Sequence, residues 1–191
     1  MGITKLALMK KLAGGSGGSS GEDSLFVQLI KGTIETINDD TITEIRTSAF
    51  YDCTSLKSVY MSNVSIVQSG AFTRCYGLEY VNLPKAKEFT WNNFYLCDAL
   101  KHADFGALEK IEGSAFKNCS VLETMIIRTN KVCTLSSVNV FAYSPFNTAG
   151  KSGTLYVPQA LIESYQNATN WSTLYANGTC NFVAIEGSEY E

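Results

Sequence analysis

Hydrophobic residues recur along the chain at a fixed interval of 22 positions. Three columns keep the same residue type through four successive units: Phe50, Phe72, Phe94 and Phe116; Cys53, Cys75, Cys97 and Cys119; Leu56, Leu78, Leu100 and Leu122. These units follow one another without an insertion. Self-similarity at one fixed period is the signature of a repeat architecture.

Apolar and polar positions alternate at the end of each unit, and a period of two predicts a half-buried strand. Two inward columns result: Val59, Val81, Ala103 and Met125; Met61, Leu83, Phe105 and Ile127. A second, shorter extended segment carries one more inward column: Ile45, Val67, Phe89, Ile111 and Cys133. The three-residue spacing of the phenylalanine, cysteine and leucine columns predicts one turn of α or 3₁₀ helix between these segments.

A unit of 22 residues cannot bury its own apolar side, whereas stacked units share one continuous core. The predicted fold is therefore an α/β repeat solenoid, rich in strands, with caps over its two ends. We expect an N-terminal amphipathic or disordered segment at 1–13, a Gly/Ser linker at 14–22, an N-terminal cap at 23–41, the repeats at 42–150 and a C-terminal cap at 151–191.

The two caps have elements of their own in the sequence. The N-terminal cap is expected to contain strands with a turn at 38–40. In the C-terminal cap we expect a strand at 155–157 and a final strand at 180–185. Between them, Pro158 is expected to open a helix whose apolar face is formed by three residues: Leu161, Ile162 and Tyr165.

Composition and charge exclude several classes of protein. The 191 residues are 45% hydrophobic with a net charge of −3, which indicates a folded domain and argues against a nucleic-acid partner. No apolar run approaches the roughly 18 residues of a membrane-spanning helix. Lys5 and Lys10 enclose only four apolar residues, so we expect no secretory signal in residues 1–13.

One unit, VQSGAFTRCYGLEYVNLP, resembles the BspA-like leucine-rich repeats of bacterial surface proteins, and the resemblance is clear over residues 42–128. The segment GTLYVPQALIESYQNATNWS is similar to the closing segment of such domains. The resemblance implies a leucine-rich-repeat-like stack and a role in adhesion and protein binding. The third unit departs from the pattern, because WNNF replaces the usual SAF or GAF, and Asn93 is expected to cause a local irregularity.

Six cysteines raise the possibility of a metal site or of disulfides. The chain has no CxxC pair, so we expect no metal and no cofactor. Equivalent cysteines in adjacent units would lie about 5 Å apart, a distance that a disulfide can bridge. Their side chains would point in parallel, however, which keeps the Cβ atoms too far apart for good disulfide geometry. We therefore expect buried free thiols that act as small hydrophobic residues, with Cys180 the least certain.

The outward positions of the strands form the candidate partner-binding surface. The residues singled out are Tyr60, Tyr80, Asn82, His102 and Asp104. Tyrosine, histidine and asparagine combine apolar area with polar tips, which suits recognition. The alternative is ordinary solvated strand surface. His102 and Asp104 are expected to form a hydrogen-bonded surface pair, and without a placed nucleophile or a metal set we expect no catalytic residues and no enzyme activity.

The N-terminal segment is a candidate docking peptide, because Ile3, Leu6 and Met9 recur at helical spacing. The sequence thus favours a non-catalytic protein-binding or adhesion module whose partner is a protein or a glycan. The alternative is a structural surface appendage of a phage or prophage particle, joined to that particle through residues 1–13. The resemblance implies a cell surface or a virion as the location, and the cytoplasm is the expectation without it.

Overall fold

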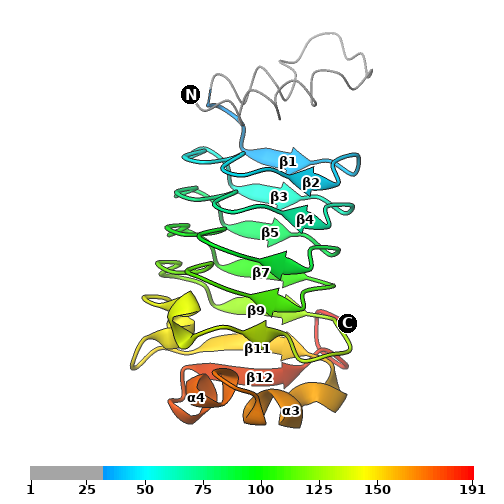
Figure 1. Ribbon diagram of the computed structural model, residues 1–191, viewed down its shortest axis with the longest axis vertical. Helices are drawn as coiled ribbons and strands as arrows, with labels where there is room; N and C mark the ends of the chain where they lie inside the picture. The colour runs from blue at the N-terminus through cyan, green and yellow to red at the C-terminus, as the bar shows by residue number, and fades with distance from the viewer. Residues whose placement is uncertain (1–31) are drawn as a thin grey trace.

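Seven parallel strands form one continuous sheet along the whole length of the stack (Figure 1). The computed structural model describes residues 32–191. In spatial order the strands are β1 (Thr36–Asn38), β3 (Ser58–Tyr60), β5 (Tyr80–Asn82), β7 (His102–Phe105), β9 (Thr124–Ile127), β11 (Gly153–Val157) and β12 (Cys180–Ala184). From β1 to β9 each residue pairs with the residue 22 positions later, so the predicted register is confirmed.

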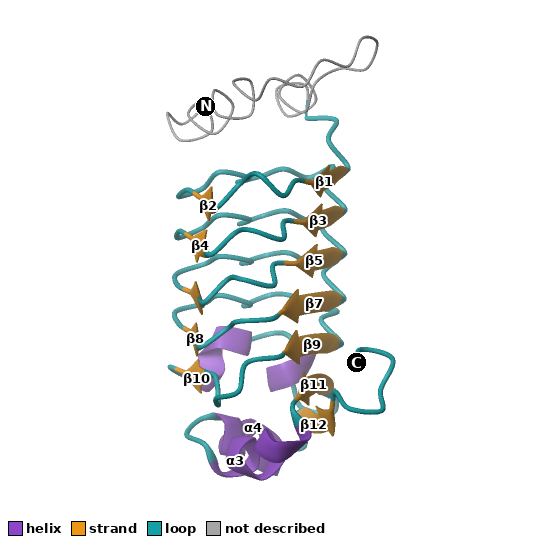
Figure 2. Cartoon of the chain, turned by 90° about the vertical axis from the view of Figure 1, so that its right-hand side faces the viewer, coloured by secondary structure: helices purple, strands orange, loops and turns teal. Residues whose placement is uncertain are grey.

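Short strands line the opposite side of the stack (Figure 2). They are β2 (Glu44–Ile45), β4 (Ile66–Val67), β6 (Glu88–Phe89), β8 (Lys110–Ile111) and β10 (Thr134–Leu135). Strand β2 pairs with β4, and β6 pairs with β8 and β10. The strand-rich solenoid expected from the repeats is thus confirmed, and its two sides differ, because only the seven-stranded sheet is continuous.

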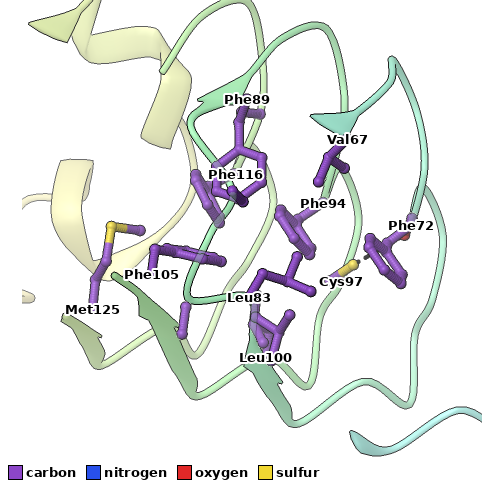
Figure 3. Close-up of a cluster of buried hydrophobic side chains, with 14 of the residues drawn as sticks. Val67, Phe72, Leu83, Phe89, Phe94, Cys97, Leu100, Phe105, Phe116 and Met125 are labelled. Atoms are coloured by element: carbon purple, nitrogen blue, oxygen red, sulfur yellow. Dashed lines mark hydrogen bonds between the residues drawn. The ribbon is translucent and has the colours of Figure 1, made fainter. Parts of the chain in front are cut away.

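The core is a ladder of identical side chains between the two sides (Figure 3). The rings of Phe50, Phe72, Phe94 and Phe116 stack on one another with centroids 5.1–5.2 Å apart. All six cysteines are buried, as expected, and none forms a disulfide among residues 32–191. Three of the thiols donate to the carbonyl oxygen of the phenylalanine in the preceding unit. Cys97 donates to Phe72 O at 3.2 Å, Cys75 donates to Phe50 O, and Cys119 donates to Phe94 O. This bond explains why a small donor suits the column.

The segment that joins the phenylalanine to the leucine is a turn, so the helical turn expected there is wrong in the regular units. The second residue after each phenylalanine has a positive φ, which ends a right-handed helix at once. These residues are Asp52, Arg74, Leu96, Asn118 and Tyr143. The backbone N–H groups of the first four of these residues instead bond to the next unit, as in Asn118 N donating to Ala142 O at 2.8 Å.

The irregularity expected at Asn93 is confirmed, and it separates the short strands into two sheets. In other units the backbone N–H of the residue directly after the short strand donates to the preceding unit, as Gln68 N does to Ile45 O. Here Thr90 N donates to Asn93 Oδ1 at 2.6 Å, and Asn93 Nδ2 donates to Gln68 O at 2.7 Å. The buried amide therefore bridges β4 and β6 in place of a direct backbone bond.

The fifth unit corrects one sequence-based assignment. Leu135, not Cys133, pairs with Ile111, because two additional residues precede β10. Cys133 is nevertheless fully buried. Its backbone is held by the C-terminal cap, since Cys133 N donates to Tyr165 Oη at 2.9 Å and Trp171 Nε1 donates to Cys133 O at 2.7 Å. The cap thus satisfies the main chain of the last short strand.

Helical segments close the C-terminal end. They are η1 (Val138–Phe141), η2 (Pro145–Asn147), η3 (Gln159–Leu161), α3 (Ile162–Asn167) and α4 (Trp171–Ala176). The helix expected after Pro158 is present, and it buries Tyr165. Helix α4, which the sequence reading did not anticipate, buries Trp171 against Phe141 and Tyr165. No helix in residues 32–191 is long and apolar enough to cross a membrane.

Candidate functional site

The five candidate partner-binding residues lie together on the solvent side of the seven-stranded sheet, which we call the outer face. They come from three neighbouring strands, β3, β5 and β7. Tyr80 pairs with His102, and Tyr60 pairs with Asn82, which pairs with Asp104. Because alternate residues of parallel strands point to the same side, the register brings all five onto one surface.

Aromatic rings form a row across this face. Tyr60 stacks on Tyr80 with centroids 5.0 Å apart, and Tyr80 stacks on His102 at 4.9 Å. Tyr190 contacts His102 at 5.2 Å and meets Tyr156 edge-on at 4.7 Å. We call Tyr60, Tyr80, His102, Tyr190 and Tyr156 the aromatic row. Tyr60 is 40% exposed, so the row is open to solvent at its β3 end.

Asp104 lies beside the row and is only 7% exposed. Its carboxylate accepts hydrogen bonds from Arg128 and, at 3.3 Å, from Asn82. Arg128 also donates to the backbone oxygen of Tyr190 at 3.0 Å. The expected His102–Asp104 hydrogen bond is not formed among the described residues, because the imidazole stacks between Tyr80 and Tyr190 while the carboxylate binds the guanidinium.

The last residues of the chain, 185–191, turn back from β12 and lie on the outer face (Figure 2); we call them the tail. The tail is held by the Arg128 bond and by its own turn, in which Ser188 N donates to Ile185 O at 3.0 Å. Ile126 points outward from β9 yet is fully buried and lies outside the main core. The tail region therefore closes the β7–β11 end of the outer face.

Burial controls the protonation of the aromatic row. It lowers the pKa of His102 below its ordinary value, although the charges of Asp104 and Glu189 partly oppose this, so the imidazole is neutral near pH 7. Burial likewise raises the pKa of the Tyr80 phenol and that of Tyr190. The row is therefore an uncharged surface flanked by the Arg128–Asp104 ion pair, of which only the carboxylate is buried.

Sequence reasoning missed three members of the site, namely Tyr156, Tyr190 and Arg128. Tyr156 could have been found, because Thr154 and Tyr156 pair with Thr124 and Ile126 after a longer loop. Tyr190 carried no signal, since it lies beyond the last strand and outside the 22-residue register. Arg128 follows β9 directly, but only the fold shows that it reaches back to Asp104.

No group of three or more His, Cys, Asp or Glu side chains in residues 32–191 is placed to hold a metal ion. Four buried thiols are unsuited to nucleophilic chemistry, because burial raises the pKa of Cys97, Cys119, Cys133 and Cys180. The arrangement on the outer face is thus suited to contact with a partner through ring edges, hydroxyl groups and amides.

The stacked parallel units and their ladder core define a leucine-rich-repeat solenoid. The profile of the BspA type leucine rich repeat region matches residues 22–148 in six copies. The chain therefore belongs to the BspA-type leucine-rich repeat family. Membership indicates a repeat protein suited to binding other proteins, and repeats of this family are generally non-catalytic. No curated protein sequence matches the chain.

Two solved structures share similarity with the chain. The leucine-rich repeat protein of T. pallidum is 23% identical with a TM-score of 0.47, over 60% of this chain and 52% of that one. A leucine-rich repeat protein from Bacteroides ovatus is 16% identical with a TM-score of 0.35, over 66% of this chain and 52% of that one. The match thus spans about half the length of each of these structures.

Proposed function

We propose that this protein is a non-catalytic binding module that holds a protein partner on its outer face. The observation that carries the proposal is the aromatic row, whose exposed Tyr60 end adjoins Tyr80 and Asn82. Tyrosine contributes a large contact area at low entropic cost, and such residues dominate protein interfaces. Because the tail covers the β7–β11 end, the partner contacts the β1–β5 end first.

The test is a double variant, Tyr60→Ala with Tyr80→Ala, measured against a partner captured by a photo-crosslinking residue at position 60. We expect affinity to fall by roughly tenfold or more, since anchor truncations cost about 2 kcal/mol or more. The melting temperature should change by only a few degrees. The matched control is Tyr51→Ala with Tyr175→Ala, which removes two exposed tyrosines outside the outer face.

Two results would contradict the assignment of this face. If the Tyr60/Tyr80 variant keeps its affinity, the partner binds elsewhere on the stack. If the control variant loses affinity equally, the effect is not specific to the aromatic row.

We propose adhesion as the setting, in keeping with the family, and a phage or prophage appendage as the alternative. The appendage hypothesis rests on residues 1–13 and the Gly/Ser linker, which lie outside the described residues and stay a prediction. Capsid or tail genes beside the coding gene would favour the appendage, and genes for surface proteins would favour adhesion.

A further inference from the structure

A tryptophan stands on the short-strand side of the stack at a position where the other units carry small residues. Trp91 follows β6, and the equivalent residues of the other units are Thr47, Ser69 and Gly113. Its side chain is 66% exposed, whereas the only other tryptophan, Trp171, is fully buried. A large indole left in water at one unit of a regular repeat has no role in the core, which suggests a role at the surface.

The position of this indole is fixed by its surroundings. A Cβ at Gly113 would lie 3.1 Å from Cδ2 and Cε3 of the ring, so the indole lies against the glycine, and a side chain at this position would displace the ring. The carbonyl oxygen of Trp91 accepts hydrogen bonds from Gly70 N at 2.8 Å and Ser69 Oγ at 2.9 Å. The backbone of Trp91 and its ring are therefore held in place before a ligand binds, which reduces the conformational entropy lost on binding.

A hollow of about 340 Å³ adjoins the ring on its β8–β10 side. Its other lining residues are Glu112, Gly113, Ser114, Ser136 and Ser137, with no aliphatic side chain among them. The hydroxyl groups of Ser114 and Ser136 make no hydrogen bond within the described part of the chain. Within residues 32–191 the Glu112 carboxylate forms one ion pair, with Lys110 at 2.8 Å. The hollow thus offers donors and acceptors beside a bare aromatic surface.

A second hollow of about 500 Å³ lies where β4 and β6 are not paired, and its lining reaches Thr90, the chain neighbour of Trp91, and Ser69, whose hydroxyl group donates to Trp91 O. Its lining includes Ser65, Gln68 and Thr90 as well as the exposed Ile66. The backbone N–H groups of Lys87 and Glu88 make no hydrogen bond among residues 32–191, whereas their equivalents Glu109 and Lys110 both bond to Lys87 O. Free amides in a hollow are further donors for a polar ligand.

We propose that Trp91 and the two hollows beside it form a binding site for an oligosaccharide chain lying along the stack. The C–H groups of a pyranose ring pack on the exposed indole, because its π face carries partial negative charge and apolar area. Sugar hydroxyl groups bond to Ser114, Ser136 and Glu112. No aliphatic side chain lines the hollow on the β8–β10 side of the ring, so hydroxyl groups and a carboxylate are available to the hydroxyl groups of a sugar there.

This site lies on the short-strand side, opposite the outer face, and it does not depend on the partner proposed there. The tryptophan content makes it directly testable. Because Trp171 is buried, the emission that acrylamide quenches in the native protein belongs to Trp91. A sugar on the indole would shift that emission to shorter wavelength and protect it from acrylamide.

The experiment titrates the full chain with hexasaccharides of β-1,4-linked glucose, β-1,4-linked N-acetylglucosamine and α-linked mannose, and with the matching disaccharides. At least one hexasaccharide is expected to protect Trp91 in a saturable way, and to bind more tightly than its disaccharide because it reaches both hollows. In calorimetry, Trp91→Ala should weaken binding roughly tenfold, equivalent to about 1.4 kcal/mol. Trp91→Phe should keep part of the affinity for the saccharide. Tyr143→Ala, which removes an exposed aromatic side chain elsewhere, should leave that affinity unchanged.

Three outcomes would overturn the proposal. No saccharide protects Trp91 at millimolar concentration, or a saccharide binds Trp91→Ala as tightly as the native chain, or a protein partner protects Trp91 while none of the sugars does. The last result would assign this surface to a protein instead.

Discussion

His102 is the one histidine of the chain, and its environment makes it a reporter of the outer face. The imidazole stacks on Tyr80 and contacts Tyr190, so the ring is partly removed from water. Burial disfavours the charged form and lowers its pKa, an effect larger than the opposing attraction of Asp104 and Glu189. Acidification should therefore disturb the aromatic row before it disturbs the core.

We predict that the His102 resonance in a proton NMR titration has a midpoint below the ordinary value near 6.5. Since the folded pKa is lower than the unfolded one, the unfolded chain binds more protons, and this contribution to stability is present above pH 6.5 and lost as pH falls. His102→Gln should therefore lose less free energy of unfolding than the native chain between pH 8 and pH 5. A midpoint at or above 6.5 would mean that the ring is not buried in the row.

The single residues show where prediction from sequence succeeded and where it stopped. The irregularity at Asn93 was visible, because an amide replaced alanine in an inward column, but its bonds to Thr90 and Gln68 required the fold. Cys133 was assigned to a column that Leu135 occupies, because a fixed period cannot detect a two-residue insertion. Position along a repeat predicts burial well, and it predicts hydrogen-bond partners poorly.

At the scale of elements, the recurring turn after each phenylalanine depends on a left-handed residue. Asn118 has φ of 61°, and its side chain makes no hydrogen bond within the described residues. Asparagine and glycine tolerate this conformation better than other residues do. The turn therefore requires a left-handed backbone conformation at one position, and this requirement is independent of packing in the core.

We predict that Asn118→Ala lowers the free energy of unfolding by about 1 kcal/mol, because alanine is strained at a positive φ. The matched control is Asn118→Gly, which should stay within about 0.5 kcal/mol of the native chain. Urea denaturation of the three proteins measures both. Equal stability of the alanine and glycine variants would show that the left-handed turn is unstrained.

The strands were predictable as elements, whereas the turns, helix α4 and the tail were not. Period-two alternation and the 22-residue spacing determine which side chains face inward, and both are visible in the sequence. The residues between Phe50 and Leu56 have a helical spacing, yet a positive φ at Asp52 makes them a turn. The tail packs through Tyr190 and the Arg128 bond, contacts that no local pattern encodes.

For the whole molecule, the two ends of the chain should contribute differently to stability. We predict that deletion of residues 1–21 leaves the melting temperature unchanged, because the Gly/Ser linker separates residues 1–13 from the 22-residue register. Association with a parent particle, complex or surface should be lost, since Ile3, Leu6 and Met9 are the proposed docking residues. Affinity for a partner on the outer face should be unchanged.

The control is deletion of residues 186–191, which removes Tyr190 and should lower the melting temperature, because His102 and Tyr156 lose the ring that packs on them and Arg128 loses its bond to Tyr190 O. Both melting temperatures can be measured by calorimetry. A large decrease on deletion of residues 1–21 would instead make the N-terminal segment part of the cap.

The break between β4 and β6 has a mechanical consequence. Backbone hydrogen bonds in a stack of parallel strands run along its long axis, so tension between the two ends pulls directly on them. The seven-stranded sheet resists such a load with an unbroken series of strand pairs, but β4 and β6 are not paired, and the Asn93 amide together with the bond from Gly70 N to Trp91 O joins the two units there. Under tension we therefore expect the stack to open first at this corner, while the strands of the continuous sheet stay paired.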